Sequence, residues 1–192
     1  MKKYSCFVLL LCMGFSFSQS KNEREERITK TEFPEIAQPY FNSFLDKVKY
    51  LKFYRETDGS KQSFEAKFKI NKLYYSVEFD TLGKLEDIEI VIKNKHIPQD
   101  IFSKISDYFD GNFRKTRVIK IQKQYVNNTL SSDENFIQHI VTHPDDTHTH
   151  FEIIAETKKE KLHELKEFTF NKNGKFISSR EVTSSSYEHA LY

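Results

Sequence analysis

Four histidines with metal-ligand spacing are concentrated near residue 145. They are His139, His143, His148 and His150. The first two are four residues apart and would share one face of a helical turn, whereas the last two are two apart and would share one face of a strand. Imidazole pairs with a nearby carboxylate supply the ligands that zinc and copper prefer. The spacing therefore defines a candidate zinc or copper site.

Two other interpretations of these histidines stay open. The segment 127–149 is polar and rich in turn-forming residues, so a solvated loop with merely polar histidines also fits. Clustered imidazoles also titrate together near neutral pH, which would make the segment a pH-sensitive loop. No HExxH pattern supplies the general base of a metalloprotease.

The remaining candidates for catalysis lack an organised set of groups. The acidic run Glu86, Asp87 and Glu89 alternates along a predicted strand, so Glu86 faces away from the other two. Such a run is typical of a strand edge kept soluble by charge. The chain has only five glycines, and it contains neither a GxSxG elbow nor a glycine-rich phosphate loop. The sequence therefore predicts a protein that is not an enzyme.

Hydrophobic periodicity predicts a helix followed by four strands, and then the same order again. The first half has a helical pattern over 36–48, and a second helix begins at Pro98, a residue that favours the first turn. Apolar and polar residues alternate in the strands, as in an antiparallel sheet with one wet face. The predicted strands are 49–56, 63–70, 73–80, 85–93, 116–126, 150–157, 162–170 and 175–182.

The two halves share a turn motif that indicates an internal repeat. The residues from Phe79 to Leu85 align without a gap with those from Phe170 to Phe176, and Gly83 matches Gly174. We therefore predict an α+β protein of two tandem repeats, each a helix plus a four-stranded antiparallel sheet. The repeats cover 33–95 and 96–183, and the segment 127–149 is an insertion in the second.

The ends of the chain have a different composition. Residues 1–18 have the charged start, apolar stretch and small residues of a signal peptide, so we expect export to the periplasm or beyond. Both cysteines, Cys6 and Cys12, would be removed with it, which leaves no thiol for a disulfide. We predict a charged, flexible lead-in at 19–32 and a flexible tail at 184–192.

Charge and hydropathy exclude two classes of partner. The chain has 30 basic and 28 acidic residues, and the two totals become equal once Lys2 and Lys3 are removed. A neutral protein is not expected to bind nucleic acid or an anionic membrane surface without specificity. No apolar run beyond the predicted signal is long enough for a transmembrane helix. The expected partner is an envelope or secreted protein.

The motifs also resemble a known family. The segment YYSVEFDTLGKLEDIEI, preceded by the helical IAQPYFNSFLDKV and the strand FEAKFKI, looks like the PepSY-like domains of exported bacterial proteins. The tandem arrangement over residues 33–182 is similar to the PepSY-like family related in fold to β-lactamase-inhibitor proteins. The resemblance implies a binding or inhibitory module that acts through its exposed sheet face and loops. No functional residue carries over from it.

Three hypotheses for function follow. The first is an exported, non-enzymatic binding protein, inhibitor-like, that uses the polar sheet face and loops. The second is a metal-binding protein that uses the histidine segment 139–150. The third is a structural component of an envelope assembly, in which the sheet edges pair with another chain.

Overall fold

The computed structural model describes residues 21–183, so the predicted signal peptide and tail lie outside the described part of the chain. A single antiparallel sheet of nine strands forms the body of the molecule, and its strands lie side by side in sequence order. The strands are β1 Glu23–Ile28, β2 Lys49–Asp58, β3 Lys61–Ile70, β4 Leu73–Phe79, β5 Leu85–Ile92, β6 Lys115–Tyr125, β7 His150–Lys159, β8 Leu162–Asn171 and β9 Phe176–Glu181.

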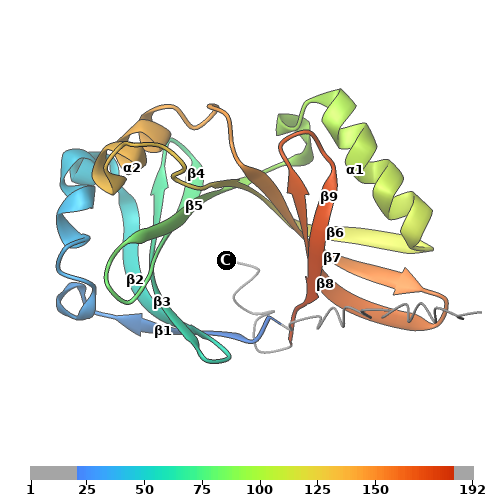
Figure 1. Ribbon diagram of the computed structural model, residues 1–192, viewed down its shortest axis with the longest axis horizontal. Coiled ribbons are helices and arrows are strands. Elements are labelled where there is room, and N and C mark those ends of the chain that lie inside the picture. The colour runs from blue at the N-terminus through green and yellow to red at the C-terminus, as the bar shows by residue number, and fades with distance from the viewer. Residues whose placement is uncertain (1–20, 184–192) are drawn as a thin grey trace, which may run out of the picture.

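All the helices cover the same face of this sheet, which curls around its other face (Figure 1). The α-helices are α1 Gln99–Asn112 and α2 Asp133–Thr142, and the 3-10 helices are η1 Lys30–Glu32, η2 Gln38–Lys47 and η3 Asn94–His96. The helix predicted over 36–48 is thus the 3-10 helix η2, with Pro39 in its first turn. Within residues 21–183, the helices lie on the convex side and the sheet alone forms the concave side.

Two apolar cores hold the helices on the convex face. In the first, Phe41 of η2 and Ile137 of α2 belong to one buried cluster with the apolar faces of β2 to β5. In the second, Phe109 of α1 packs on Phe168 and Phe170, with ring centroids 4.9 and 5.7 Å apart. Aromatic residues dominate both cores, and burial of large apolar side chains is the main stabilising contribution.

The two glycine turns have the same hydrogen bonds. In the first, the Asp80 carboxylate accepts from the backbone N–H of Leu82 and of Lys84 at 2.8 and 2.9 Å. In the second, the Asn171 side chain accepts from the N–H groups two and four residues later, both at 3.0 Å. Gly83 and Gly174 have φ of 80° and 79°. The shared sequence motif therefore encodes one turn geometry twice.

The sheet differs from the prediction of two separate four-stranded sheets. β5 pairs directly with β6, in a register that places Ile88 opposite Tyr125 and Ile92 opposite Ile121. Alternation along a strand indicates which face is buried, but it does not tell which strand lies at its edge. Pairing of β5 with β6 gives hydrogen-bond partners to backbone N–H and C=O groups that would be unpaired at the edges of two separate sheets.

Two segments predicted to be irregular are regular structure. Within the lead-in 19–32, β1 pairs with β2 along its whole length. The insertion 127–149 contains α2, whose Ile137, Ile140 and Val141 are buried. Ser132 caps this helix, because its hydroxyl accepts from the backbone N–H of Asn135. These apolar side chains complete the first core, which explains why the segment is ordered.

The curl brings the two ends of the sheet together. Lys21 forms an isolated parallel bridge with Val182 just after β9. The backbone N–H of Lys21 donates to Glu181 at 2.6 Å, and the carbonyl of Lys21 accepts from Thr183 at 3.0 Å. The concave face is therefore enclosed at this point, and its polar side chains lie inside the molecule rather than on an open surface.

Candidate functional site

Acidic side chains line the concave face because it is the polar face of each strand. Glu25 of β1 lies opposite Glu56 of β2, and Glu65 of β3 lies opposite Glu78 of β4. Glu78 in turn lies opposite Asp87 of β5. Successive strands thus place carboxylates on the same side, and the closed curl shields them from solvent.

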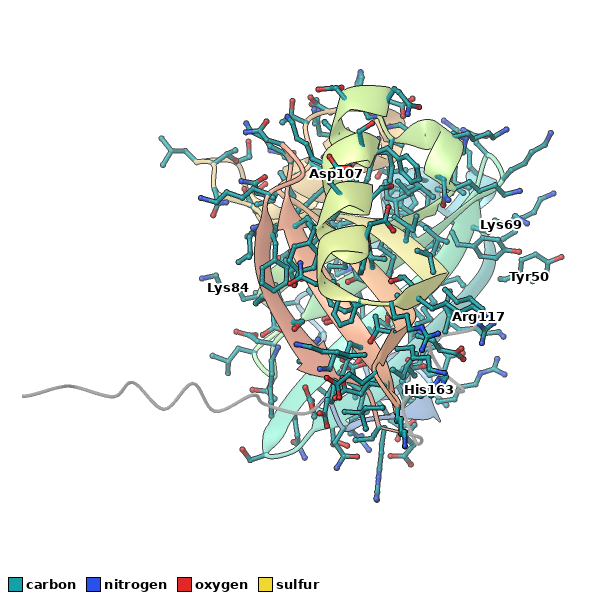
Figure 2. The ribbon with its side chains drawn as sticks, turned by 90° about the vertical axis from the view of Figure 1, so that its right-hand side faces the viewer. Tyr50, Lys69, Lys84, Asp107, Arg117 and His163 are labelled. Atoms are coloured by element: carbon teal, nitrogen blue, oxygen red, sulfur yellow. The ribbon has the colours of Figure 1, made fainter. Side chains whose placement is uncertain are left out.

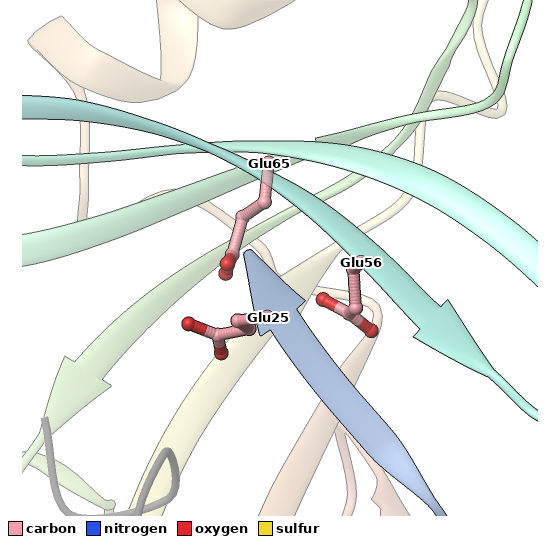
Figure 3. A group of neighbouring side chains, drawn as sticks. All are labelled: Glu25, Glu56 and Glu65. Atoms are coloured by element: carbon pink, nitrogen blue, oxygen red, sulfur yellow. The ribbon is translucent and has the colours of Figure 1, made fainter. Parts of the chain in front are cut away.

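Three of these carboxylates converge. Oxygen atoms of Glu25, Glu56 and Glu65 all lie within 4.8 Å of one another. Figure 3 shows the three side chains extending from neighbouring strands toward a common point. Glu56 and Glu65 are buried, at 7% and 4% exposure. Burial of several like charges is unfavourable unless cations or protons compensate them.

Lysine compensates part of this acidic group. The Lys67 ammonium lies 2.7 Å from Glu25 Oε1 and 3.1 Å from Glu65 Oε2. Burial lowers the pKa of Lys67, but the carboxylates of Glu65 and Glu25 outweigh this effect and raise its pKa. Glu56 has no such partner. Burial, together with the charges of Glu23 and Glu65, raises the pKa of Glu56 to about 9.

A second acidic group lies beside the first. Oxygens of Glu78, Asp87 and Glu89 are also within 4.8 Å of one another. Burial and the neighbouring carboxylates raise the pKa of both Glu78 and Asp87 well above the usual range. Gln124 donates to Asp87 Oδ2 at 2.9 Å, whereas the buried Asp87 Oδ1 has no hydrogen bond. This group was not predicted: β5 lies between β4 and β6, so the acidic run does not protect a strand edge.

An ion-pair network closes the curl at its two ends. Glu167 of β8 contacts the Lys21 ammonium and Arg180 Nε, each at 2.7 Å. Arg180 also reaches Asp58 of β2 at 3.1 Å. Burial would raise the pKa of Glu167, but the charges of Lys21 and Arg180 lower it to about 2. This carboxylate is therefore ionised, and it links β8 and β9 to Lys21, just before β1.

A large groove lies beside the acidic interior, at one end of β2 to β6. Its volume is about 770 Å³, which is in the range of ligand-binding sites. Tyrosines and lysines dominate its lining, and no carboxylate among the described residues lines it. The lining tyrosines and lysines are Tyr50, Tyr54, Tyr74, Tyr75, Lys52, Lys67, Lys69, Lys93 and Lys120.

The outer part of the groove is exposed. Tyr50 is 72% exposed and Tyr74 is 51% exposed. Lys69 donates to the Tyr74 hydroxyl at 3.0 Å and lies 4.3 Å from the centre of its ring. Figure 2 shows Tyr50 and Lys69 projecting from the same side of the molecule. Exposed tyrosines beside lysines form a surface that favours anionic groups.

The structure places the four candidate histidines in two different environments. On α2, the His139 and His143 rings stack 4.7 Å apart, and His139 Nε2 lies 2.6 Å from Asp146. Near the start of β7, the His148 ring packs 4.1 Å from that of Phe151, and burial lowers its pKa to about 4. His150 Nδ1 lies 2.7 Å from Gln124 Oε1.

The four histidines do not form one metal centre. Among residues 21–183, the groups of three or more candidate ligands with converging atoms consist of carboxylates alone. His139 in α2 and His143 directly after it are exposed, whereas His148 lies beside the rings of Tyr125 and Phe151. The spacing in sequence predicted each pair, but the fold separates the pairs. Alternating glutamates in neighbouring strands were the sequence signal for the site that the fold does assemble.

Solved structures of low sequence identity have the same fold. A DUF2874 family protein from Bacteroides ovatus matches with a TM-score of 0.51 and 10% identity, over 77% of this chain and 86% of that one. A Bacteroides eggerthii protein provisionally assigned to the periplasm matches with a TM-score of 0.51 and 9% identity, over 77% and 88%. A BLIP-like protein from Bacteroides fragilis matches with a TM-score of 0.49 and 14% identity, over 79% and 88%.

The first two matches support the resemblance at the level of the fold alone. None of the three names refers to an enzymatic activity. No protein-family model and no curated protein matches the sequence. Within residues 21–183, no helix is long and apolar enough to span a membrane.

Proposed function

We propose that the protein is an exported, non-enzymatic binding protein, and that the tyrosine- and lysine-lined groove accepts an acidic segment of a partner protein. The observation that carries the proposal is the composition of the groove: five lysines and four tyrosines, with no carboxylate among the lining residues described. Positive charge attracts an acidic segment over long range, and the tyrosine rings provide apolar contact area at low entropic cost.

The acidic interior supports a binding role rather than catalysis. Burial and neighbouring carboxylates raise the pKa of Glu56, Glu78 and Asp87, as at many functional sites, but the cavity in the acidic interior has a volume of only about 30 Å³. That space holds one small ion or water, which leaves no room for an organic substrate. The groove is the larger and more accessible site. An inhibitor of a periplasmic or secreted enzyme would present such a surface to its target.

We also propose that the two halves are copies of one unit, a helix followed by four strands. The support is the pair of equivalent turns and the register shift beside each, between Glu78 and Phe79 and between Thr169 and Phe170. Sheet-edge assembly with a second chain has less support, because the edge strands β1 and β9 meet through Lys21 and Val182.

A charge reversal in the groove tests the binding proposal. The probe is a fluorescein-labelled peptide of about ten residues, rich in glutamate and aspartate, measured by fluorescence anisotropy. The Lys69→Glu variant removes the ammonium that contacts Tyr74 and adds a repulsive charge, so we expect binding at least about tenfold weaker. Wild-type binding should also weaken between about 50 and about 300 mM NaCl.

The matched control is Lys84→Glu, which makes the same charge change. Lys84 is exposed and lies on the opposite side of the molecule from Tyr50 and Lys69 (Figure 2). This variant should bind the peptide like the wild type, and a lysine-rich peptide of equal length should not bind. Equal weakening by both variants would contradict the groove as the binding site. Pull-down from an envelope extract, with wild type and Lys69→Glu as paired baits, would then identify the partner.

A further inference from the structure

A small cavity lies among the carboxylates of the concave face. Its volume is about 30 Å³, enough for one water or one ion. Six glutamates and three lysines line it, so acidic side chains outnumber basic ones. The carboxylates are Glu23, Glu25, Glu56, Glu65, Glu78 and Glu89. A buried space with this lining attracts a cation.

Within residues 21–183, Glu56 is a buried carboxyl group that lines this cavity. It is 7% exposed, and no described residue gives it a hydrogen bond or an ion pair. Its carboxylate lines the cavity and points toward Glu25 and Glu65 (Figure 3). A buried carboxyl group without a partner is destabilising, and such groups in folded proteins are normally paired or bound to a metal ion.

We propose that this cavity binds one hard divalent cation, with Glu25, Glu56 and Glu65 as its protein ligands. Their oxygens lie within 4.8 Å of one another, a separation that one ion can span. An all-oxygen site favours calcium, magnesium or manganese over zinc and copper, which prefer nitrogen or sulfur. Calcium is favoured over magnesium because magnesium retains several waters, and the cavity has room for about one.

Lys67 limits the affinity of this site. Its ammonium is already 2.7 Å from Glu25 and 3.1 Å from Glu65, so it competes with an added cation for the same oxygens. We therefore expect weak binding, with a Kd on the order of 0.1–1 mM. Removing the ammonium should strengthen binding. A purely structural role for the carboxylates does not predict that gain.

Titration calorimetry on the EDTA-treated protein tests the proposal, with calcium, magnesium and manganese chloride as the probes. We expect one calcium site, and binding at least about tenfold weaker in Glu56→Gln. This variant should fold, because glutamine has the same shape and Glu56 has no partner to lose. Lys67→Met should bind calcium more tightly than the wild type does.

The matched control is Glu26→Gln, on the same strand as Glu25 but on its other face, where it pairs with Arg55. It should leave calcium binding unchanged. The proposal is overturned if none of the three cations binds at concentrations up to about 10 mM. Wild-type affinity in Glu56→Gln would also overturn it, as would weaker calcium binding by a folded Lys67→Met variant.

Discussion

At the scale of single residues, Gly83 and Gly174 connect the sequence motif to the packing of the helices. Each has a positive φ and lies in a turn that touches the helical segment of its own half. An added Cβ at Gly83 would lie 3.0 Å from Pro34 Cβ, and at Gly174 it would lie 3.0 Å from the carbonyl oxygen of Ile101. The motif is therefore constrained by backbone conformation and by contact with a helix.

Gly83→Ala should lower the free energy of unfolding by about 1–3 kcal/mol, because it adds backbone strain and a clash. Urea denaturation measures the difference. Gly111→Ala is the control, since a Cβ there meets nothing within 4 Å and the residue lies in α1. Alanine favours helix over glycine, so the control should be neutral or more stable by up to about 1 kcal/mol. Equal destabilisation by both variants would contradict this account of the turn.

At the scale of elements, α2 changes the meaning of the insertion 127–149. The segment resembles a loop because it is polar and rich in turn residues, yet its apolar residues recur at helical spacing after a capping serine. It packs beside η2 over the first core. His139 and His143 stack on each other at the end of α2, and the converging groups of three or more candidate ligands among residues 21–183 contain no histidine.

Ile137→Ala should cost about 2–4 kcal/mol of unfolding free energy, because Ile137 is fully buried against the first core. Leu130→Ala, in the same insertion, is the control. Leu130 is fully exposed, so its truncation should change stability by less than about 0.5 kcal/mol. If the insertion 127–149 were a solvated loop, neither substitution would change the stability measured by thermal or urea denaturation.

At the scale of the whole molecule, closure of the curl makes the polar face an interior. Arg180 and Lys21 neutralise Glu167 at the junction, and Arg180 also pairs with Asp58. The Lys21–Glu167 and Asp58–Arg180 contacts join residues more than 120 positions apart in the chain. Without closure, Glu56, Glu78 and Asp87 would face bulk water, and burial would not raise the pKa of these three carboxyl groups.

Arg180→Gln should lower the free energy of unfolding by about 1–3 kcal/mol near pH 7, since it leaves Glu167 buried with one cation fewer. The pKa of Glu167 is lowered from 4.5 to about 2, so its contribution is complete above 4.5 and is lost as the pH falls toward 2. The difference between variant and wild type should therefore shrink in urea denaturation at about pH 3.

The control for this prediction is Arg117→Gln. Arg117 pairs with Glu156, but both side chains are largely exposed, so the loss should stay below about 1 kcal/mol. A difference between Arg180→Gln and the wild type that did not depend on pH would contradict the role of Glu167.

The sequence by itself determined the α+β class, eight of the nine strands, the two glycine turns and the polar or apolar side of those eight strands, because these follow from local periodicity and turn chemistry. Only the tertiary structure decided that one sheet contains all nine strands, that β1 joins this sheet, that α2 completes the first core, and that the polar face is enclosed. Strand neighbours and sheet curvature depend on contacts between distant residues, which alternation does not encode. The carboxylates of Glu25, Glu56 and Glu65 converge for that reason, whereas the histidine pairs predicted from spacing lie apart.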